Sequence, residues 1–489
     1  MPVPSVGSLI IAAIVVPLLS AAFCFIVPRA ARALTLTAAL VLLVDVLALT
    51  RALVTEGASR YRLGGWGAPV GIELLTDGLS VFMLLSTALA GLAATLYALR
   101  YFPPQPRSTA GFWPLWLFLW GALNALFLSA DLFNLYVTLE LVGLAAVAMV
   151  ALAGSADAIT GAMRYLLTTI AASLTYLLGV ALLYHHAPVL DMVSLGRMLE
   201  PGAATWIALA LMVVALLVKS AVFPLHFWLP PAHASAPAPV SAVLSGLVVK
   251  ATVYLLARLW LDVMPEGRRD LGTALAGLGA GAIIWGSIQA LRQRELKLMV
   301  AYSTVAQVGY LLLPFAVKSA EAAAIAWRGA LYFVVSHALA KGAMFMAVGN
   351  LARLEGSGSL DDLHLAARQR PMTVGAFGVA GVSIIGLPPS GGFLAKWLLL
   401  EASFAASQGW VVAVILLGGL LSAAYVFRVV GLAFIESDPT PEPRPAVDRL
   451  EWIALVVALS TVVLGFVAPV LLGLLEIDDP FARAAEVPS

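Results

Sequence analysis

Residues 211–231 read LMVVALLVKSAVFPLHFWLPP, an apolar stretch in which Lys219 is followed by three prolines, Pro224, Pro230 and Pro231. Proline interrupts the hydrogen-bond ladder of a helix, and a broken backbone at membrane depth is tolerated only against other protein or a water-filled cavity. A second stretch of this kind, Gly386-Leu-Pro-Pro-Ser-Gly-Gly392, stands just before Lys396. Two discontinuous helices in corresponding positions of two halves are typical of an ion site in a transporter built from repeats.

The composition indicates a lipid environment. Of the 489 residues, 62% are hydrophobic and only 11% are charged, whereas soluble chains carry about 25% charged residues. The net charge of +1 gives no basic surface to neutralise nucleic-acid phosphates, so no nucleic-acid partner is expected. The single cysteine, Cys24, cannot build a disulfide, a zinc site or an iron–sulfur cluster within this chain, and we expect no cofactor or metal in it.

Apolar stretches long enough to cross roughly 30 Å of hydrocarbon, about 20 residues each, recur along the chain. They predict an all-α, polytopic membrane protein with about fourteen transmembrane helices, two of them discontinuous. The expected spans are 7–27, 33–54, 78–101, 111–129, 132–153, 160–184, 205–223, 238–261, 271–291, 297–316, 325–350, 372–388, 409–433 and 450–474.

The positions of the two broken spans, the seventh and the twelfth, fit a repeat of five spans. Because five is odd, the two repeats would be inverted relative to each other. This organisation predicts helices 1–3 in residues 1–105, a first five-helix repeat in 106–262, a second in 263–435, and a C-terminal helix with a tail in 436–489.

Lysine and arginine in the loops indicate the orientation, because the more basic side faces the cytoplasm. If the spans alternate, one side carries Arg29, Arg32, Arg100, Arg107, Arg292, Arg294 and Lys297, and the other carries Arg60, Arg62, Arg268 and Arg269. An even number of spans puts both termini on one side. We expect this to be the periplasmic or extracellular face of a bacterial cytoplasmic (inner) membrane.

Four of the six lysines lie inside apolar spans, whereas the 22 arginines lie mainly in loops and at helix ends. The four are Lys219, Lys250, Lys341 and Lys396. A charge near the bilayer centre costs roughly 2.5–3.5 kcal/mol, so four of them indicate a function. A desolvated lysine can release its proton near neutral pH and arginine cannot, which suits a proton relay. A lysine that reaches the interface or pairs statically is the alternative for any one of them, but a weaker one for all four.

Two further ionisable side chains belong with these lysines. Glu140 lies in LYVTLELVGLAAV, inside the fifth span, and Lys219 is the partner that we expect to hold it ionised. His337 precedes Lys341 by four residues, so both project from one helix face. Histidine titrates near neutral pH and suits a relay, while a lone buried histidine is the alternative.

These blocks together resemble the antiporter-like subunits shared by respiratory complex I, membrane-bound hydrogenases and Mrp-type multisubunit cation/proton antiporters. The matching stretches are Gly64–Trp66 with Asp77–Ser80, Asp131–Glu140, Lys219–Pro230, Ala301–Tyr310, His337–Lys341 and Gly386–Lys396. The resemblance covers nearly the whole chain. Pro231 departs from it, because the family often has an aspartate after Trp-Leu-Pro.

The resemblance implies fourteen helices, two inverted five-helix repeats that each form a proton half-channel, and a set of relay residues. In this set Glu140 and Lys219 resemble the family's glutamate–lysine pair, Lys250 its central lysine, His337 and Lys341 its connecting residues, and Lys396 its terminal lysine. The resemblance also implies other membrane subunits as partners, with protons and possibly Na⁺ as the transported ions.

The number of residues after the final span reduces the number of candidate parent complexes. The chain stops about 15 residues past its final span, which resembles the shorter members: a D-type subunit of an Mrp antiporter, or an M- or N-like subunit of complex I or a membrane-bound hydrogenase. The Asp131–Tyr136 block favours the Mrp D-type or a hydrogenase-related form.

Two other classes of function stay open. A redox catalyst would need a cysteine cluster, a haem-type histidine pair in the bundle or a nucleotide fingerprint, and enzyme activity would therefore belong only to the assembly. An inert scaffold would lack the buried ionisable groups. Unchanged proton transport in a reconstituted complex carrying Lys219→Ala would favour the scaffold.

Overall fold

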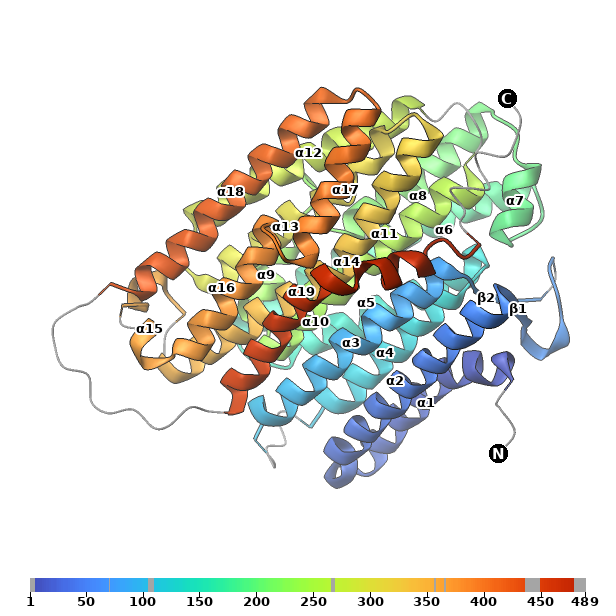
Figure 1. The fold of residues 1–489 in the computed structure, drawn as a ribbon. Coiled ribbons are helices and arrows are strands. Elements are labelled where there is room, and N and C mark those ends of the chain that lie inside the picture. The colour runs from blue at the N-terminus through green and yellow to red at the C-terminus, as the bar shows by residue number, and fades with distance from the viewer. Residues whose placement is uncertain are drawn as a thin grey trace.

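The computed structural model describes residues 5–69, 71–103, 110–264, 269–355, 358–364, 366–435 and 449–478. They form one bundle of tilted, roughly parallel helices (Figure 1). Within these ranges, eleven helices are long and apolar enough to cross a membrane, and three shorter apolar helices accompany them. The predicted all-α, multi-pass membrane fold is confirmed. The number of crossings and the inverted repeats stay predictions, as do the domain boundaries drawn from them.

The described residues of the first half form ten α-helices and a β-hairpin. The helices are α1 (Val6–Ile26), α2 (Ala31–Glu56), α3 (Gly78–Tyr101), α4 (Phe112–Leu128), α5 (Leu132–Ala151), α6 (Ala156–His186), α7 (Met192–Met198), α8 (Ala203–Lys219), α9 (Leu229–Ser235) and α10 (Ala238–Val243). The hairpin pairs β1 (Ser59–Arg62) with β2 (Glu73–Thr76) in antiparallel register.

The second half begins with α11 (Val249–Arg258), which lies between two π-helical segments, Leu244–Val248 and Leu259–Val263. The helices that follow are α12 (Arg269–Arg292), α13 (Leu296–Tyr310), α14 (Ala320–Glu355), α15 (Ala366–Gln369), α16 (Pro371–Ile385), α17 (Gly391–Ala405), α18 (Gly409–Ala433) and α19 (Arg449–Leu474). Short 3₁₀ segments cover Pro28–Ala30, Leu63–Gly65, Leu313–Ala316 and Leu360–Asp362.

Polar caps fix the starts of several apolar helices. The side chains of Asp131, Ser155, Asp191 and Ser390 each accept a hydrogen bond from a backbone N–H in the first turn that follows. Asp77 forms a reciprocal capping box with Ser80 at the start of α3 (the helix has the predicted bounds 78–101). Such caps satisfy the free N–H groups of a helix start, so these boundaries are encoded locally.

Both predicted breaks are present. Helix α8 ends at Lys219 and α9 begins only at Leu229, while α16 ends at Ile385 and α17 begins at Gly391. Gly386 ends α16 in the left-handed region, with φ 88°, where glycine avoids the steric cost of a Cβ. The two discontinuous helices are therefore confirmed. The predicted span 238–261, in contrast, is not one regular α-helix, because the two π-helical segments interrupt it.

The two ends of the described chain lie at the same end of the bundle (Figure 1). The β-hairpin and α7 lie at that end, and α15 lies at the opposite end (Figure 1). Helix α1 contacts β1, and after the end of α19 the carbonyl of Ile477 accepts a hydrogen bond from Gly78 N at the start of α3. This agrees with an even number of spans, while the membrane face stays a prediction. Arg107 and Arg268, which entered the prediction of orientation, lie outside the described residues.

Burial separates the outer helices from the central ones. Large apolar side chains are exposed along α1, α2, α6, α18 and α19, as expected for helices that face lipid. In contrast, the most apolar stretches of Ala238–Val263 and Ala320–Arg353 are entirely buried inside the bundle. These two central segments carry Lys250, His337 and Lys341.

Candidate functional site

All four lysines predicted from the sequence are buried. Their exposed fractions are 4% for Lys219, 1% for Lys250, 0% for Lys341 and 5% for Lys396. None of the four side chains therefore extends to the surface of the described chain. They come from α8, α11, α14 and α17, and thus from both halves of the chain. We call these four lysines, together with Glu140 and His337, the buried row.

Lys219 forms an ion pair with Glu140. Its Nζ lies 3.3 Å from Glu140 Oε1, which joins the end of α8 to the middle of α5. Lys219 is the last residue of α8, where the negative end of the helix dipole also favours a cation. The structure thus brings together the two residues that the sequence suggested as partners. Their role in transport stays a prediction.

Lys250 lies in the first turn of α11, after the first π-helical segment. Its Nζ donates to the carbonyl oxygen of Ser245, inside that segment. The hydroxyl groups of Ser220 and Thr252 lie 2.6 Å apart, so polar atoms connect the chain next to Lys219 with the helix of Lys250. On the other side, the hydroxyl of Ser245 lies 2.8 Å from that of Thr304, which leads to α13.

Lys341 occupies the centre of α14. Its Nζ donates to the carbonyl of Val300, at 3.0 Å, and to the hydroxyl of Ser303, both on α13. His337 lies one turn earlier and is equally buried. Neither ring nitrogen of His337 has a hydrogen-bond partner among the described residues. The ring lies within electrostatic reach of Lys250, Lys341 and Lys396, which come from both halves of the chain.

Lys396 closes the row at the second broken helix. Its Nζ donates to the carbonyl oxygens of Ile384 (2.7 Å) and Ile385 (3.2 Å), the last residues of α16. It also lies 4.2 Å from the centre of the Tyr310 ring. A helix C-terminus and an aromatic face both stabilise a cation, and the break in the helix is what exposes these carbonyls.

A further set of buried polar side chains lies on α13 and α18, which both belong to the second half of the chain. Gln307 Nε2 donates to Ser422 Oγ (3.1 Å) and to the hydroxyl of Tyr425 (3.2 Å). All three are fully buried. Gln307 lies in the quoted block Ala301–Tyr310, but we did not name it as a site residue.

His233 was not predicted from the sequence. This residue on α9 is fully buried, its ring stacks on Phe345, and both ring nitrogens lack a partner among the described residues. It lies within electrostatic reach of Lys250, Lys341 and Lys297. Its sequence signal was a histidine directly after the proline-broken span, a position that we passed over.

A buried ion pair between Arg258 and Asp77 was not predicted either. The two guanidinium nitrogens Nη1 and Nη2 each lie 2.6 Å from a carboxylate oxygen, and Arg258 Nε donates to the hydroxyl of Tyr254. Both charged side chains are almost completely buried. Arg258 is therefore an exception to the expected exposure of arginine, and it ties α11 to the start of α3.

A second charged cluster lies at the hairpin end of the bundle. Arg60 Nη1 lies 2.9 Å from a carboxylate oxygen of Glu73 and 2.9 Å from one of Asp191. Burial alone would raise the pKa of Asp191, but hydrogen bonds from Ser194 together with Arg60 hold that pKa below its ordinary value. This cluster is a fixed contact between the hairpin and the start of α7.

The buried lysines, His337 and Glu140 are side chains of types that can exchange protons. Lysine, histidine and glutamate accept and release protons, and the hydroxyl groups between them can pass protons on through water. Across the described ranges, no group of three histidine, cysteine, aspartate or glutamate side chains gathers as a set of metal ligands. The site consists of four buried lysines and His337, and Lys219 is paired with Glu140.

Fold and site together define a polytopic membrane subunit of transporter type. The family described as NADH:quinone oxidoreductase/Mrp antiporter, transmembrane, matches residues 129–422. The chain belongs to this family, and it is thus an antiporter-like, proton-translocating membrane subunit of the kind shared by Mrp antiporters and complex I.

Individual relatives come from both branches of the family. The chain is 40% identical over 421 residues to the N-type subunit of an NADH-quinone oxidoreductase from Desulforudis audaxviator, covering 84% of this chain and 83% of the relative. It is 30% identical over 400 residues to the D-type subunit of a Na⁺/H⁺ antiporter from Bacillus subtilis, covering 81% and 80%. A chain of the Mrp complex from Dietzia sp. has the same fold, with a TM-score of 0.88 at 23% identity over 98% of this chain and 99% of that one.

Proposed function

We propose that this chain carries protons across the membrane along its row of buried ionisable side chains. The order of the path is Glu140 and Lys219, then Lys250, then His337 and Lys341, and finally Lys396. The observation that carries the proposal is that four lysines, all at most 5% exposed, lie on α8, α11, α14 and α17, two in each half of the chain. Four buried cations are costly in a bilayer protein, and a proton path is the function that this arrangement serves.

The proposed step at the first half depends on the Glu140–Lys219 pair. At 3.3 Å the carboxylate favours the charged lysine, and a larger separation would remove this support. Lengthening the contact would thus release a proton from Lys219 toward Lys250. The hydroxyl groups of Ser220 and Thr252 would pass the proton on in this step.

The second half would then respond through charge repulsion. Lys250 and Lys341 lie within electrostatic reach of each other, and His337 lies within electrostatic reach of Lys250, Lys341 and Lys396. Because like charges in a low-dielectric interior repel, a proton that arrives on one group disfavours a proton on the next. Successive sites would load and unload in turn, and Lys396 would release the proton to the far face.

The first candidate parent is an Mrp-type Na⁺(cation)/H⁺ antiporter, with this chain as its D-type subunit. Support comes from the Asp131–Tyr136 block and from the D-type antiporter relative of Bacillus subtilis. Other membrane subunits of the same complex would then be its partners, and a coupled cation flux would drive the change at Glu140 and Lys219.

The second candidate is an N-like subunit of a complex I relative in a bacterial cytoplasmic membrane. A specific observation favours it, because the N-type relative has 40% identity, against 30% for the D-type relative. In this case electron transfer in neighbouring subunits would drive the same proton path.

Purification of the intact complex from native membranes tests both the parent complex and the proton path. For the Mrp candidate we expect small antiporter subunits to copurify, and a Na⁺ gradient to drive proton movement in liposomes without an electron donor. Flavin and iron–sulfur subunits, with transport that requires a reductant, would instead favour the second candidate. Intact complex without any proton movement under either condition would contradict the proton path itself.

A further inference from the structure

An apolar groove runs along the outside of the bundle between α3 and α19. Its volume is about 530 Å³, and Leu339 of α14 contributes to its lining. The lining extends from Trp452 to Leu471, about 28 Å of helix at 1.5 Å per residue. This length is close to the roughly 30 Å of a hydrocarbon core. Figure 1 shows α19 lying across the outer face of the bundle, over α3 and α14.

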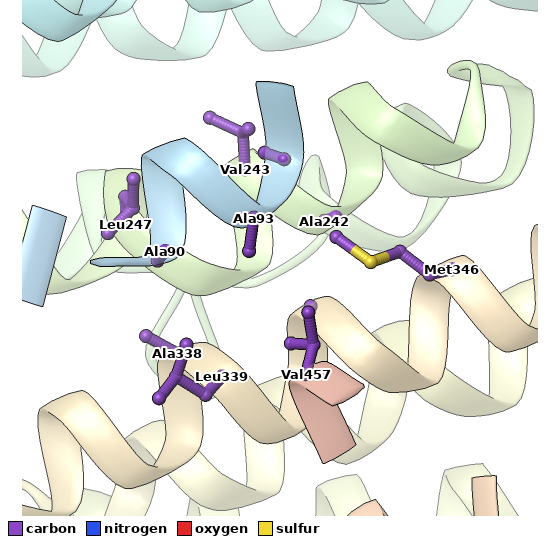
Figure 2. Close-up of a pocket in the computed structure, with 11 residues that line it drawn as sticks. Ala90, Ala93, Ala242, Val243, Leu247, Ala338, Leu339, Met346 and Val457 are labelled. Carbon is purple, nitrogen blue, oxygen red and sulfur yellow. The ribbon is translucent and has the colours of Figure 1, made fainter. Parts of the chain in front are cut away.

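The groove reaches inward to the central helices. A small apolar cavity shares Ala93, Leu339 and Val457 with it (Figure 2). This cavity is also lined by Ala338 and Gly342 of α14, which directly follow His337 and Lys341 in the chain. Whatever fills the groove therefore packs against the helix at the centre of the buried row.

The side chains of the groove favour a flexible chain over another helix. Close helix contacts in membranes use small residues that let two backbones approach. The α19 wall instead carries bulky residues such as Val456, Val463 and Val467, and Ser460 is its one small residue. An acyl chain adapts to such an uneven apolar surface without a matching backbone.

One end of the groove is positively charged. Arg100 follows the lining residue Leu96 by one helical turn, and Arg449 precedes Trp452 by three residues, so each lies on the groove side of its helix. Both arginine side chains are exposed. Arg353 reaches the same end, because its Nη1 donates to the carbonyl of Tyr101, at 2.6 Å. Basic side chains beside a tryptophan at a membrane boundary match an anionic lipid headgroup.

We propose that this groove is a binding site for one anionic phospholipid. An acyl chain lies between α3 and α19 against Leu339, and the headgroup phosphate binds Arg100 and Arg449. This site is separate from the proton path, and its test requires no transport.

The test uses the purified full complex in phosphatidylcholine nanodiscs that contain a small fraction of phosphatidylglycerol with a photoactivatable acyl chain. Crosslinked peptides are then identified by mass spectrometry. We expect labelling of α3 and α19, with weaker labelling by the matching phosphatidylcholine probe. Ser460→Trp fills the groove and should abolish this labelling. Leu459→Trp adds the same ring one residue away, on an exposed position outside the lining, and should leave it unchanged.

A second pair of variants tests the headgroup. The double variant Arg100→Gln/Arg449→Gln should reduce the preference for phosphatidylglycerol over phosphatidylcholine about tenfold, because each basic side chain near anionic lipid contributes a few-fold. Arg51→Gln, an exposed arginine of α2 near the hairpin end, should keep the preference. Equal labelling in all variants would overturn the proposal in favour of ordinary surrounding lipid. No labelling of α3 and α19 by the phosphatidylglycerol probe in the native complex would overturn it in favour of a protein partner that covers the groove.

Discussion

The ammonium group of Lys219 lies 3.3 Å from Oε1 of Glu140, and the two side chains differ in exposure, at 4% and 23%. The lysine is thus sealed inside the bundle, while the carboxylate keeps some contact with the exterior. Because each charge stabilises the other in a medium of low dielectric constant, the protonation of the pair depends on its separation. This makes the pair the natural start of the proposed path.

Replacement of Glu140 by glutamine should slow proton transport by about tenfold or more, which corresponds to ~1.4 kcal/mol in the barrier. The amide keeps the size of the side chain but no longer supports the charge on Lys219. Proton uptake into liposomes that contain the complex measures the effect. Glu401→Gln on α17, where the glutamate is exposed, is the matched control and should transport normally. Equal rates for the two variants would remove Glu140 from the path.

Gly386 should not tolerate alanine. Its φ is +88°, and a Cβ would lie 2.8 Å from Cδ of Lys396, so the substitution strains the backbone and displaces the lysine. We expect a loss of about 1–2 kcal/mol in stability together with slower transport. Gly375→Ala, inside α16 and with no atom of a neighbouring segment within 4 Å of the added Cβ, should leave transport unchanged and should not lower stability. Thermal unfolding in detergent and liposome transport report the two effects, and similar results for both alanine variants would contradict this account of the break.

The pair of Arg258 and Asp77 should matter for stability more than for transport. Removal of one partner leaves the other charge buried, which costs about 3–5 kcal/mol. Arg258→Met should therefore lower the unfolding temperature of the complex strongly. The double variant Arg258→Met/Asp77→Asn should recover part of the loss, because the uncompensated carboxylate is gone while the helix cap is kept. A double variant that is less stable than Arg258→Met would rule out the uncompensated charge as the cause.

Asp191 gives a pH dependence outside the membrane spans. The pKa of Asp191 in the folded chain lies below the ordinary value. Between these two pKa values the folded chain binds fewer protons than the unfolded chain, so stability rises with pH. The contribution is complete above the ordinary aspartate pKa of about 3.9 and is lost as the pH falls through the lower folded value. Asp191→Asn should thus be less stable than the native chain at pH 7. The difference should disappear under acid conditions, and a difference that grows on acidification would contradict the sign.

Much of the fold follows from the sequence because the bilayer sets simple rules. An apolar run of sufficient length must form a helix, and the proline and glycine breaks beside Lys219 and Lys396 were visible for the same reason. The burial of the lysines could also be predicted, since each is flanked by apolar residues in the sequence. The capping residues Asp77 and Ser390 fix their helix starts through local contacts.

Other features depend on neighbours that no local pattern reveals. The π-helical segments on both sides of α11 arise within a long, mostly apolar run, where hydrophobicity does not distinguish one helical hydrogen-bonding pattern from another. The contact of Arg258 with Asp77 joins residues 181 positions apart. His233 becomes notable only once α9 is seen packed near the buried lysines. The Glu140–Lys219 contact, in contrast, could be predicted from the sequence, because two opposite charges in apolar spans have few other ways to be satisfied.

The most direct test of the buried row is proton transport by the reconstituted complex when each buried lysine is changed in turn to methionine. Methionine keeps the length and apolar character of the stem but binds no proton. Assembly of each complex is verified by its subunit composition. We predict that transport falls at least about tenfold for Lys219, Lys250, Lys341 and Lys396. The same change at exposed Lys318 should have no effect. Full-rate transport by assembled complexes that lack any of the four buried lysines would contradict the account.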